Sequence, residues 1–124
     1  MVQIALLMGL LVFGDGAKGT LQTKEKSIQG SFEIKRIGDR QVVAFGADFK
    51  TKKGPDLKVV LSPQAFSDAS GKSAMQGAVV LGALKATKGS QQYRVPAGLD
   101  LRRYQSLLVH CEKYSVLWGG AALR

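Results

Sequence analysis

From Gly30 onward, the chain is a series of short apolar runs separated by turn residues. The runs are rich in Val, Leu, Ile, Phe and Tyr, and the stretches between them are rich in Gly, Pro, Asp, Ser and Lys. Several runs alternate between apolar and polar residues, which is typical of a strand with one buried face. The pattern predicts one all-β domain over residues 30–124, an antiparallel β-sandwich or barrel-like structure of about seven or eight strands.

The positions of the apolar runs locate the individual strands. They cover residues 31–37, 41–45, 57–62, 78–86, 91–95, 106–113 and 114–123. Residues 38–39 and 54–56 carry the Gly, Pro and Asp chemistry of tight turns. Residues 62–77 form a long polar connection that we expect to hold a short helix. Gly82 indicates a bulge or a close backbone approach, and Asp100 is expected to cap a single helical turn.

The N-terminal part of the chain differs from this pattern. Residues 2–13 are almost continuously apolar, a run that is too short to span a bilayer but has the length of the central region of a secretory signal. We predict a signal peptide over residues 1–16, although no Lys or Arg precedes the apolar run. The alternative is a buried N-terminal strand or helix. Residues 17–29 are polar and aperiodic, and are predicted to be a linker.

Charge changes this picture little. The 124 residues include 18 Lys and Arg against 9 Asp and Glu, which gives a formal net charge of +9. The basic residues are scattered, and no recognisable nucleic-acid module or row of stacking aromatics accompanies them, so no specific nucleic acid is expected. We interpret the charge as a solvated surface with a weak attraction to anionic surfaces.

Chemistry is concentrated near the C-terminus, which contains the only Cys, His and Trp of the chain. A single cysteine, Cys111, excludes an intramolecular disulfide and metal sites of the CxxC type. In a regular strand Cys111 shares a face with Leu107 and Val109, whereas His110 points to the opposite face. The apolar neighbours favour a buried Cys111, which would be a structural residue rather than a reactive one. A bulge would be needed to bring His110 and Cys111 to one metal or to make a catalytic pair.

Other side chains with ligating or acid–base groups have simpler interpretations. These are Asp48, Asp56, Asp100, Met75, Lys85, Tyr93 and Trp118. The three aspartates adjoin turns and are expected to bond to backbone amides rather than to form a cation site. Met75 is expected in a loop or core rather than as a soft haem ligand. Lys85, Tyr93 and Trp118 are expected to pack, with the glycines after Trp118 allowing close approach.

Several segments occur in an order that indicates a family. They are Phe45–Phe49, Gly54–Ser62, Leu81–Lys85, Gly89–Pro96, Leu99–Ser106, Val109–Val116, Trp118–Gly119 and Ala121–Leu123. From about Ser31 to the C-terminus the chain thereby resembles the electron-transfer DM-thirteen domain family. The resemblance implies an extracytoplasmic β domain that does redox work through a near-universal cysteine, here Cys111. That cysteine would act as a bare thiol or hold a group such as haem. The family commonly has Trp immediately before this cysteine, where this chain has His110.

Three functional hypotheses follow. The first is a redox or electron-transfer module of the cell envelope in which Cys111 is the working thiol, or a thiolate ligand of haem or a metal, and which acts on a redox or cell-surface protein. The alternative is a non-catalytic binding module, periplasmic or at the cell surface, in which Cys111 is structural. The third is a polyanion-binding protein. None of them requires a stand-alone enzyme, and the mature chain is expected to be extracytoplasmic without a transmembrane span.

Overall fold

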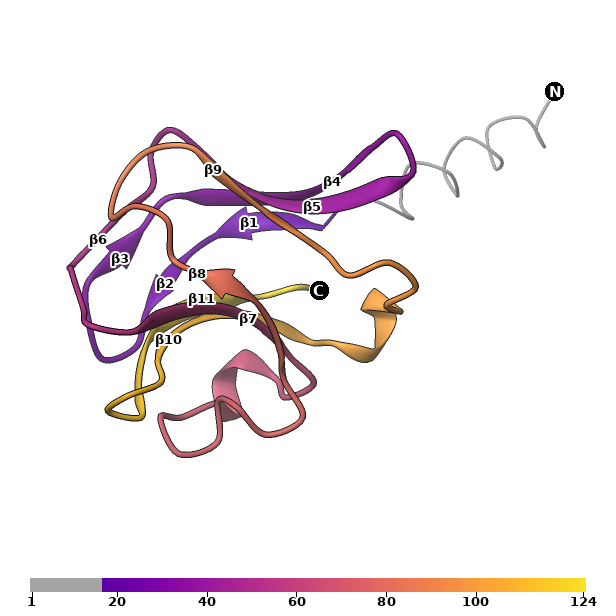
Figure 1. Cartoon of the computed structure of the whole chain (residues 1–124). Helices are drawn as coiled ribbons and strands as arrows, with labels where there is room; N and C mark the ends of the chain where they lie inside the picture. Colours follow the sequence, from indigo (N-terminus) through magenta and orange to yellow (C-terminus); the bar gives the residue numbers. More distant parts are fainter. Residues whose placement is uncertain (1–16) are drawn as a thin grey trace, which may run out of the picture.

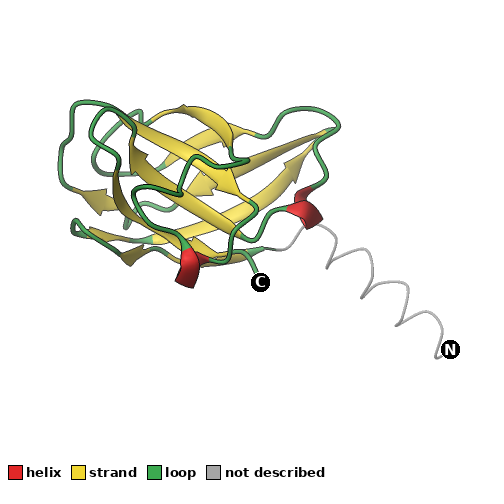
Figure 2. Ribbon diagram, turned by 90° about the horizontal axis from the view of Figure 1, so that it is seen from below, coloured by secondary structure: helices red, strands yellow, loops and turns green. Residues whose placement is uncertain are grey.

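The computed structural model describes residues 17–124; the signal peptide predicted for residues 1–16 lies outside the described residues. Two antiparallel sheets face each other, and a two-stranded sheet and two short 3-10 turns complete the fold (Figures 1 and 2). One sheet has the order β1(Lys18–Thr20), β4(Ser31–Ile37), β5(Arg40–Phe45), β9(Gln91–Arg94). The other has the order β2(Gln22–Thr23), β11(Val116–Ala122), β10(Ser106–Cys111), β7(Leu57–Ser62), β8(Val79–Ala83). The predicted all-β sandwich is confirmed, with eleven strands in residues 17–124 where seven or eight were expected, and the sheets do not join into a closed barrel.

The main core lies between the two sheets and is filled by alternate residues of the facing strands. Its members include Phe32, Ile34, Val43, Phe45, Phe49, Tyr93, Val59, Leu61, Leu107, Val109 and Trp118. The Phe45 ring lies 4.7 Å from that of Phe49 and 5.5 Å from that of Tyr93, measured between centroids. Burial of such side chains is the main source of stability for a domain of this size.

A second, smaller core covers the outer face of the five-stranded sheet. Val60, Leu108 and Leu117 point outward from β7, β10 and β11 and are buried there. The connection between β7 and β8 folds over them, contributing η1(Phe66–Asp68) together with Ala69, Ala74, Met75 and Ala78. As a result every residue of β10 is buried, because both faces of this central strand are covered.

The segment predicted to be a polar linker is instead part of the sandwich. Within residues 17–29 lie β1, β2 and β3(Ile28–Gln29), and β3 pairs with β6(Lys50–Thr51). Leu21 and Ile28 are 3% exposed and belong to the main core. The linker prediction is therefore wrong for this segment, since two isolated apolar residues are buried by strands far away in the sequence.

Several local expectations are confirmed. Gly82 has a φ of +156° and adjoins a bulge in β8, where Leu81 is the extra residue between the partners of Val59 and Val60. Its place within an apolar run indicated such a bulge. Asp100 accepts a hydrogen bond from the Arg102 amide and caps η2(Leu101–Arg103). The second of the two glycines after Trp118, Gly120, lets β11 approach β10 closely. A Cβ atom there would lie 2.1 Å from the Leu107 carbonyl oxygen.

Candidate functional site

Cys111 is the last residue of β10 and lies at one end of the sandwich. Its strand neighbours are Leu57, the first residue of β7, and Val116, the first residue of β11. The side chain points into the main core with Leu107 and Val109 and has no exposed surface. The expectation of an inward-facing cysteine is confirmed, and Cys111 is a free thiol. The Cys111 side chain is covered only by the ends of strands, however, because β10 ends and β7 and β11 begin at this point.

His110 lies on the opposite face of β10 from Cys111. In the β-ladders it stands opposite Lys58 on β7 and Leu117 on β11, both of which face away from the main core. A bulge does occur here, with Trp118 as the extra residue between the partners of Val109 and His110. It lies on β11, so it leaves His110 and Cys111 on opposite sides of the sheet. The two side chains therefore do not form a catalytic pair and do not share one metal.

The imidazole of His110 is buried without full hydrogen bonding. It is 1% exposed, and its Nδ1 atom has no hydrogen-bond partner among the described residues. Burial lowers the pKa of His110 below its usual value, and the negative charges of Glu112, Glu25 and Asp56 oppose this effect. His110 is therefore a neutral, partly unsatisfied group at neutral pH, of the kind that weakens rather than strengthens a core.

His110 is expected to make the fold sensitive to acid. Because its folded-state pKa is depressed, the unfolded chain takes up this proton first as the pH falls below the ordinary value of about 6.5. Stability is then lost with falling pH until the folded-state pKa is passed. We predict a smaller loss for His110→Leu between about pH 7 and pH 5, measured by urea unfolding at each pH. Equal losses in the wild type and the variant would show that other groups cause the effect.

An ion-pair cluster crosses the strand ends beside Cys111. The Lys58 Nζ atom lies 2.9 Å from carboxylate oxygens of both Asp56 and Glu112. These two hydrogen bonds raise the pKa of Lys58, with the bond to Glu112 the larger cause. The Glu112 amide also donates to the Asp56 carbonyl at 3.1 Å. We call Asp56, Lys58 and Glu112 the Lys58 clamp, since they connect the start of β7 to the end of β10.

Trp118 packs at the Cys111 end of the sandwich, on the side of the main core. Its indole Nε1 donates to the Lys52 carbonyl at 3.0 Å, and the Lys26 Nζ atom lies 5.9 Å from its ring centroid. Gly54 allows this ring to approach, because a Cβ atom there would lie 2.8 Å from Trp118. Glu25 accepts a hydrogen bond from the Leu117 amide at 2.8 Å. Neither this packing nor the Lys58 clamp could be read from sequence spacing, because the partners are far apart in the chain.

The surroundings of Cys111 do not fit haem. A thiolate ligand of haem requires an apolar pocket large enough for the macrocycle beside the sulfur. Here the sulfur belongs to a fully buried side chain between Leu57 and Val116, and the inner face around it is filled by the main core. Met75 packs in the outer core, on the other side of the sheet, and cannot complete such a site. Within residues 17–124, no group of three or more His, Cys, Asp or Glu is placed to hold a metal ion.

The remaining sequence candidates have structural roles. Asp48 accepts hydrogen bonds from the amide and hydroxyl of Ser31, which lower the pKa of its carboxyl. Asp100 caps η2 and pairs with Arg102, and this pair lowers the pKa of Asp100 as well. Tyr93 is buried, and its hydroxyl accepts from the Lys85 amide at 2.8 Å. The aspartates thus bind local partners instead of converging on one site.

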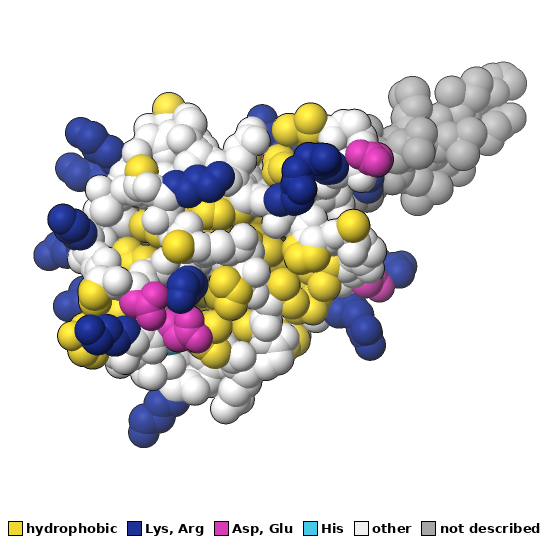
Figure 3. Space-filling view, in the orientation of Figure 1, with side chains coloured by type: hydrophobic (Ala, Val, Ile, Leu, Met, Phe, Trp, Pro, Cys, Tyr) yellow, Lys and Arg dark blue, Asp and Glu magenta, His cyan; other side chains and the backbone are white. Residues whose placement is uncertain are grey.

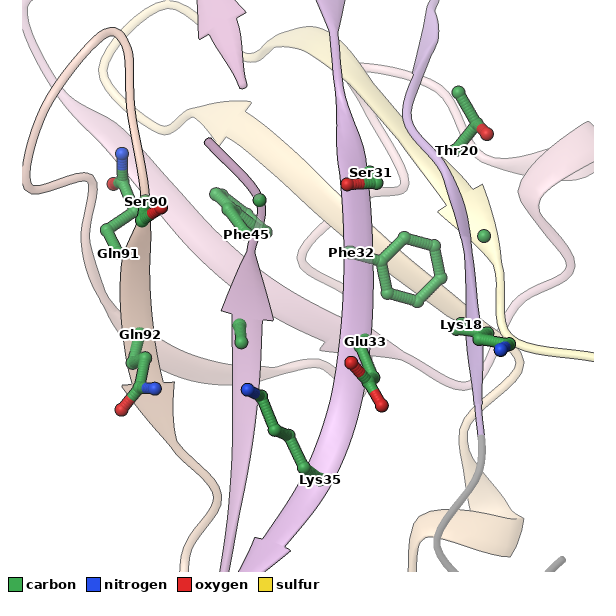
Figure 4. A pocket seen from close by; sticks show the side chains of 13 residues that line it. Lys18, Thr20, Ser31, Phe32, Glu33, Lys35, Phe45, Ser90, Gln91 and Gln92 are labelled. Atoms are coloured by element: carbon green, nitrogen blue, oxygen red, sulfur yellow. The ribbon is translucent and has the colours of Figure 1, made fainter. Parts of the chain in front are cut away.

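A hollow lies elsewhere, on the outer face of the four-stranded sheet (Figure 4). It has a volume of about 560 Å³, and its walls come from β1, β4, β5 and the start of β9. Lys18, Glu33, Lys35 and Gln92 are among its lining residues. A second hollow, of about 450 Å³, lies over Leu117 on the outer face of the other sheet. Neither is lined by Cys111, so neither is a pocket for its chemistry.

Comparison with known proteins identifies the family. The model of the family described as "Electron transfer DM13" matches residues 20–123, which is nearly the whole described domain and includes Cys111. No curated protein sequence and no solved structure gave a significant match. Within the described part of the chain, no helix is long and apolar enough to cross a membrane. Taken with the sandwich and its single buried cysteine, the match shows that this chain belongs to the electron transfer DM13 family.

Proposed function

We propose that this chain is a redox module of the cell envelope in which Cys111 is the working thiol. The family description supports a role in electron transfer. The observation that carries the choice of residue is the position of Cys111, which is the only cysteine and lies where three strands end. The apolar run at residues 2–13 supports a location outside the cytoplasm. A bare thiol is preferred to a haem ligand because the residues around the sulfur do not fit a macrocycle.

The proposed step is thiol–disulfide exchange with a protein of the envelope. Cys111 gives its thiol proton to solvent, and its Sγ atom attacks one sulfur of a partner disulfide. A new S–S bond joins Cys111 to the partner, the partner's own S–S bond breaks, and the second partner sulfur leaves as a thiolate with the electron pair. Cys111 is thereby oxidised to a mixed disulfide, and the leaving sulfur is reduced.

This step requires the Cys111 end of the sandwich to open. Only the first residues of β7 and β11 pair with Cys111, so separation of these strand ends exposes the thiol without unfolding the remaining ladders. The Lys58 clamp connects the start of β7 to the end of β10 and so opposes the separation of these two strand ends. The Lys58 clamp therefore controls how often the strand ends open and expose the Cys111 thiol to a partner disulfide.

Breaking the clamp tests this proposal. Lys58→Met removes both ion pairs and keeps an apolar stem of similar length. We expect it to raise the rate of mixed-disulfide formation with glutathione disulfide by roughly two- to fivefold, in line with the modest strength of half-exposed ion pairs. The readout is the mass of the adduct over time in native buffer.

Two controls make the result specific. Lys53→Met changes the same residue type in the adjacent loop, where the exposed Lys53 side chain has no ion pair among the described residues, and should leave the rate unchanged. Cys111→Ala should form no adduct. An unchanged rate of adduct formation in Lys58→Met would contradict the proposal that the Lys58 clamp controls access to Cys111.

A second candidate function is a non-catalytic binding module in which Cys111 is structural. The complete burial of its side chain favours this candidate. It predicts that no mixed disulfide forms until the domain is unfolded, and that Cys111→Ala leaves partner binding intact. The exchange experiment therefore decides between the two functions.

A further inference from the structure

The fold gathers all the arginines of the chain at the end of the sandwich opposite Cys111. They are Arg36, Arg40, Arg94, Arg102, Arg103 and Arg124. The β5–β9 ladder places Arg94 opposite Val42, which is two residues along β5 from Arg40. Arg124 lies beside η2, because its side chain donates to the carbonyls of Leu101 and Tyr104. The β4–β5 turn and η2 lie at the same end in Figure 1. We call this group of six residues the arginine end.

The lysines are distributed differently. Six of the twelve lie in β6 or in the turns and loops around β3 and β6, namely Lys24, Lys26, Lys50, Lys52, Lys53 and Lys88. Basic side chains accordingly flank both ends of the molecule in Figure 3. The two ends therefore have the same sign of charge but carry different cations, and guanidinium and ammonium groups differ in what they bind.

The arginine end is open to a ligand. All six arginines are exposed. The side chains of Arg40, Arg94 and Arg103 make no hydrogen bond or ion pair with any described residue, although the charge of Arg103 helps to lower the pKa of Asp100. Arg102 is paired with Asp100 at 3.0 Å. The hairpin turn contributes one further carboxylate, Asp39. Positive charge therefore exceeds negative charge across this end.

We propose that the arginine end binds the phosphate groups of an anionic membrane. Guanidinium groups bind phosphate through two parallel hydrogen bonds, and arginines on several separate elements suit an array of phosphates rather than one small ligand. Clustered basic side chains at a membrane surface are attracted to anionic lipid headgroups.

Membrane binding at this end fixes the orientation of the domain. β10 begins at Ser106, next to η2, and ends at Cys111. The thiol end therefore points away from the lipid surface and toward soluble partners. This inference goes beyond the proposed function, because lipid binding does not require Cys111.

The test is co-sedimentation of the full chain with two kinds of vesicle, one of phosphatidylcholine alone and one with about 30% phosphatidylglycerol. The variant Arg40→Gln/Arg94→Gln/Arg103→Gln removes three unpaired charges. The matched control, Lys52→Gln/Lys53→Gln/Lys88→Gln, removes the same net charge from exposed positions at the other end. We expect the arginine variant to lose at least about tenfold in partitioning to the anionic vesicles and the lysine variant much less. Binding to the neutral vesicles should not change.

Three results would overturn the proposal. Equal losses in both variants would show a response to net charge alone. Equal wild-type binding to neutral and anionic vesicles would show that the arginines play no part. Binding of soluble polyphosphate, lost in the arginine variant, without a preference for anionic vesicles would identify a soluble polyanion instead. Circular dichroism should show both variants folded, and their exchange with glutathione disulfide should match the wild type, which separates this test from that of Cys111.

Discussion

Replacing Phe45 by alanine is expected to lower the free energy of unfolding by about 3–5 kcal/mol. Phe45 is 2% exposed, and its ring packs against those of Phe49 and Tyr93 in the centre of the main core. Truncation removes the buried ring and leaves a cavity. The cavity cannot easily close, because β5 is held between β4 and β9 by backbone pairing on both sides. Urea unfolding followed by circular dichroism measures the change.

The control for Phe45 is Ile37→Ala. Ile37 is also on the four-stranded sheet, at the end of β4, but its side chain is 50% exposed. Its truncation should cost less than about 1 kcal/mol, as is usual for surface positions. Similar costs for the two variants would mean that the space between the sheets is not the core of the domain.

Gly120→Ala is expected to destabilise the domain by about 2–3 kcal/mol, although it adds a single methyl group. The added Cβ atom would lie 2.1 Å from the Leu107 carbonyl oxygen and 3.0 Å from the Leu108 Cα atom. Both atoms belong to the backbone of β10, so β10 and β11 must move apart. The same urea unfolding experiment measures the cost.

The control for Gly120 is Gly38→Ala in the β4–β5 turn. Gly38 has a φ of +65°, but a Cβ atom there would contact nothing within 4 Å. Its substitution should therefore cost only the conformational penalty of about 1–2 kcal/mol. If Gly120→Ala were no more destabilising than this control, the close approach of β10 and β11 would be refuted.

The strands were predictable because their signals are local. Alternation along 31–37 and 57–62, together with the turn residues between them, identified β4 and β7, and strand periodicity placed Cys111 on the inner face. Residues 17–29 were missed because their burial depends on distant partners. Leu21 and Ile28 are isolated apolar residues that become core only when β2 pairs with β11 and β3 with β6.

The sequence identified Cys111 as the candidate residue, but it did not predict the residues that surround it. His110 was expected on the face opposite Cys111, and it lies there, but its burial depends on neighbours that sequence spacing does not identify. The Lys58 clamp combines residues from β7, from the turn before it and from the turn after β10. The proximity of β7 and the turn after β10 follows only from the register of the ladder. The same is true of the arginine end, which comes from four separate segments.

The proposed redox function requires that reagents reach Cys111 in the folded chain. The most direct measurement is the rate at which a small thiol reagent modifies Cys111, from native buffer to the urea concentration that unfolds the domain. Local opening at the Cys111 end predicts measurable modification in native buffer, at a rate that hardly changes with urea until global unfolding begins, because little surface is exposed on opening. A rate that follows the full urea dependence of global unfolding from the lowest concentrations would contradict the account, and Cys111 would then be a structural residue of the core.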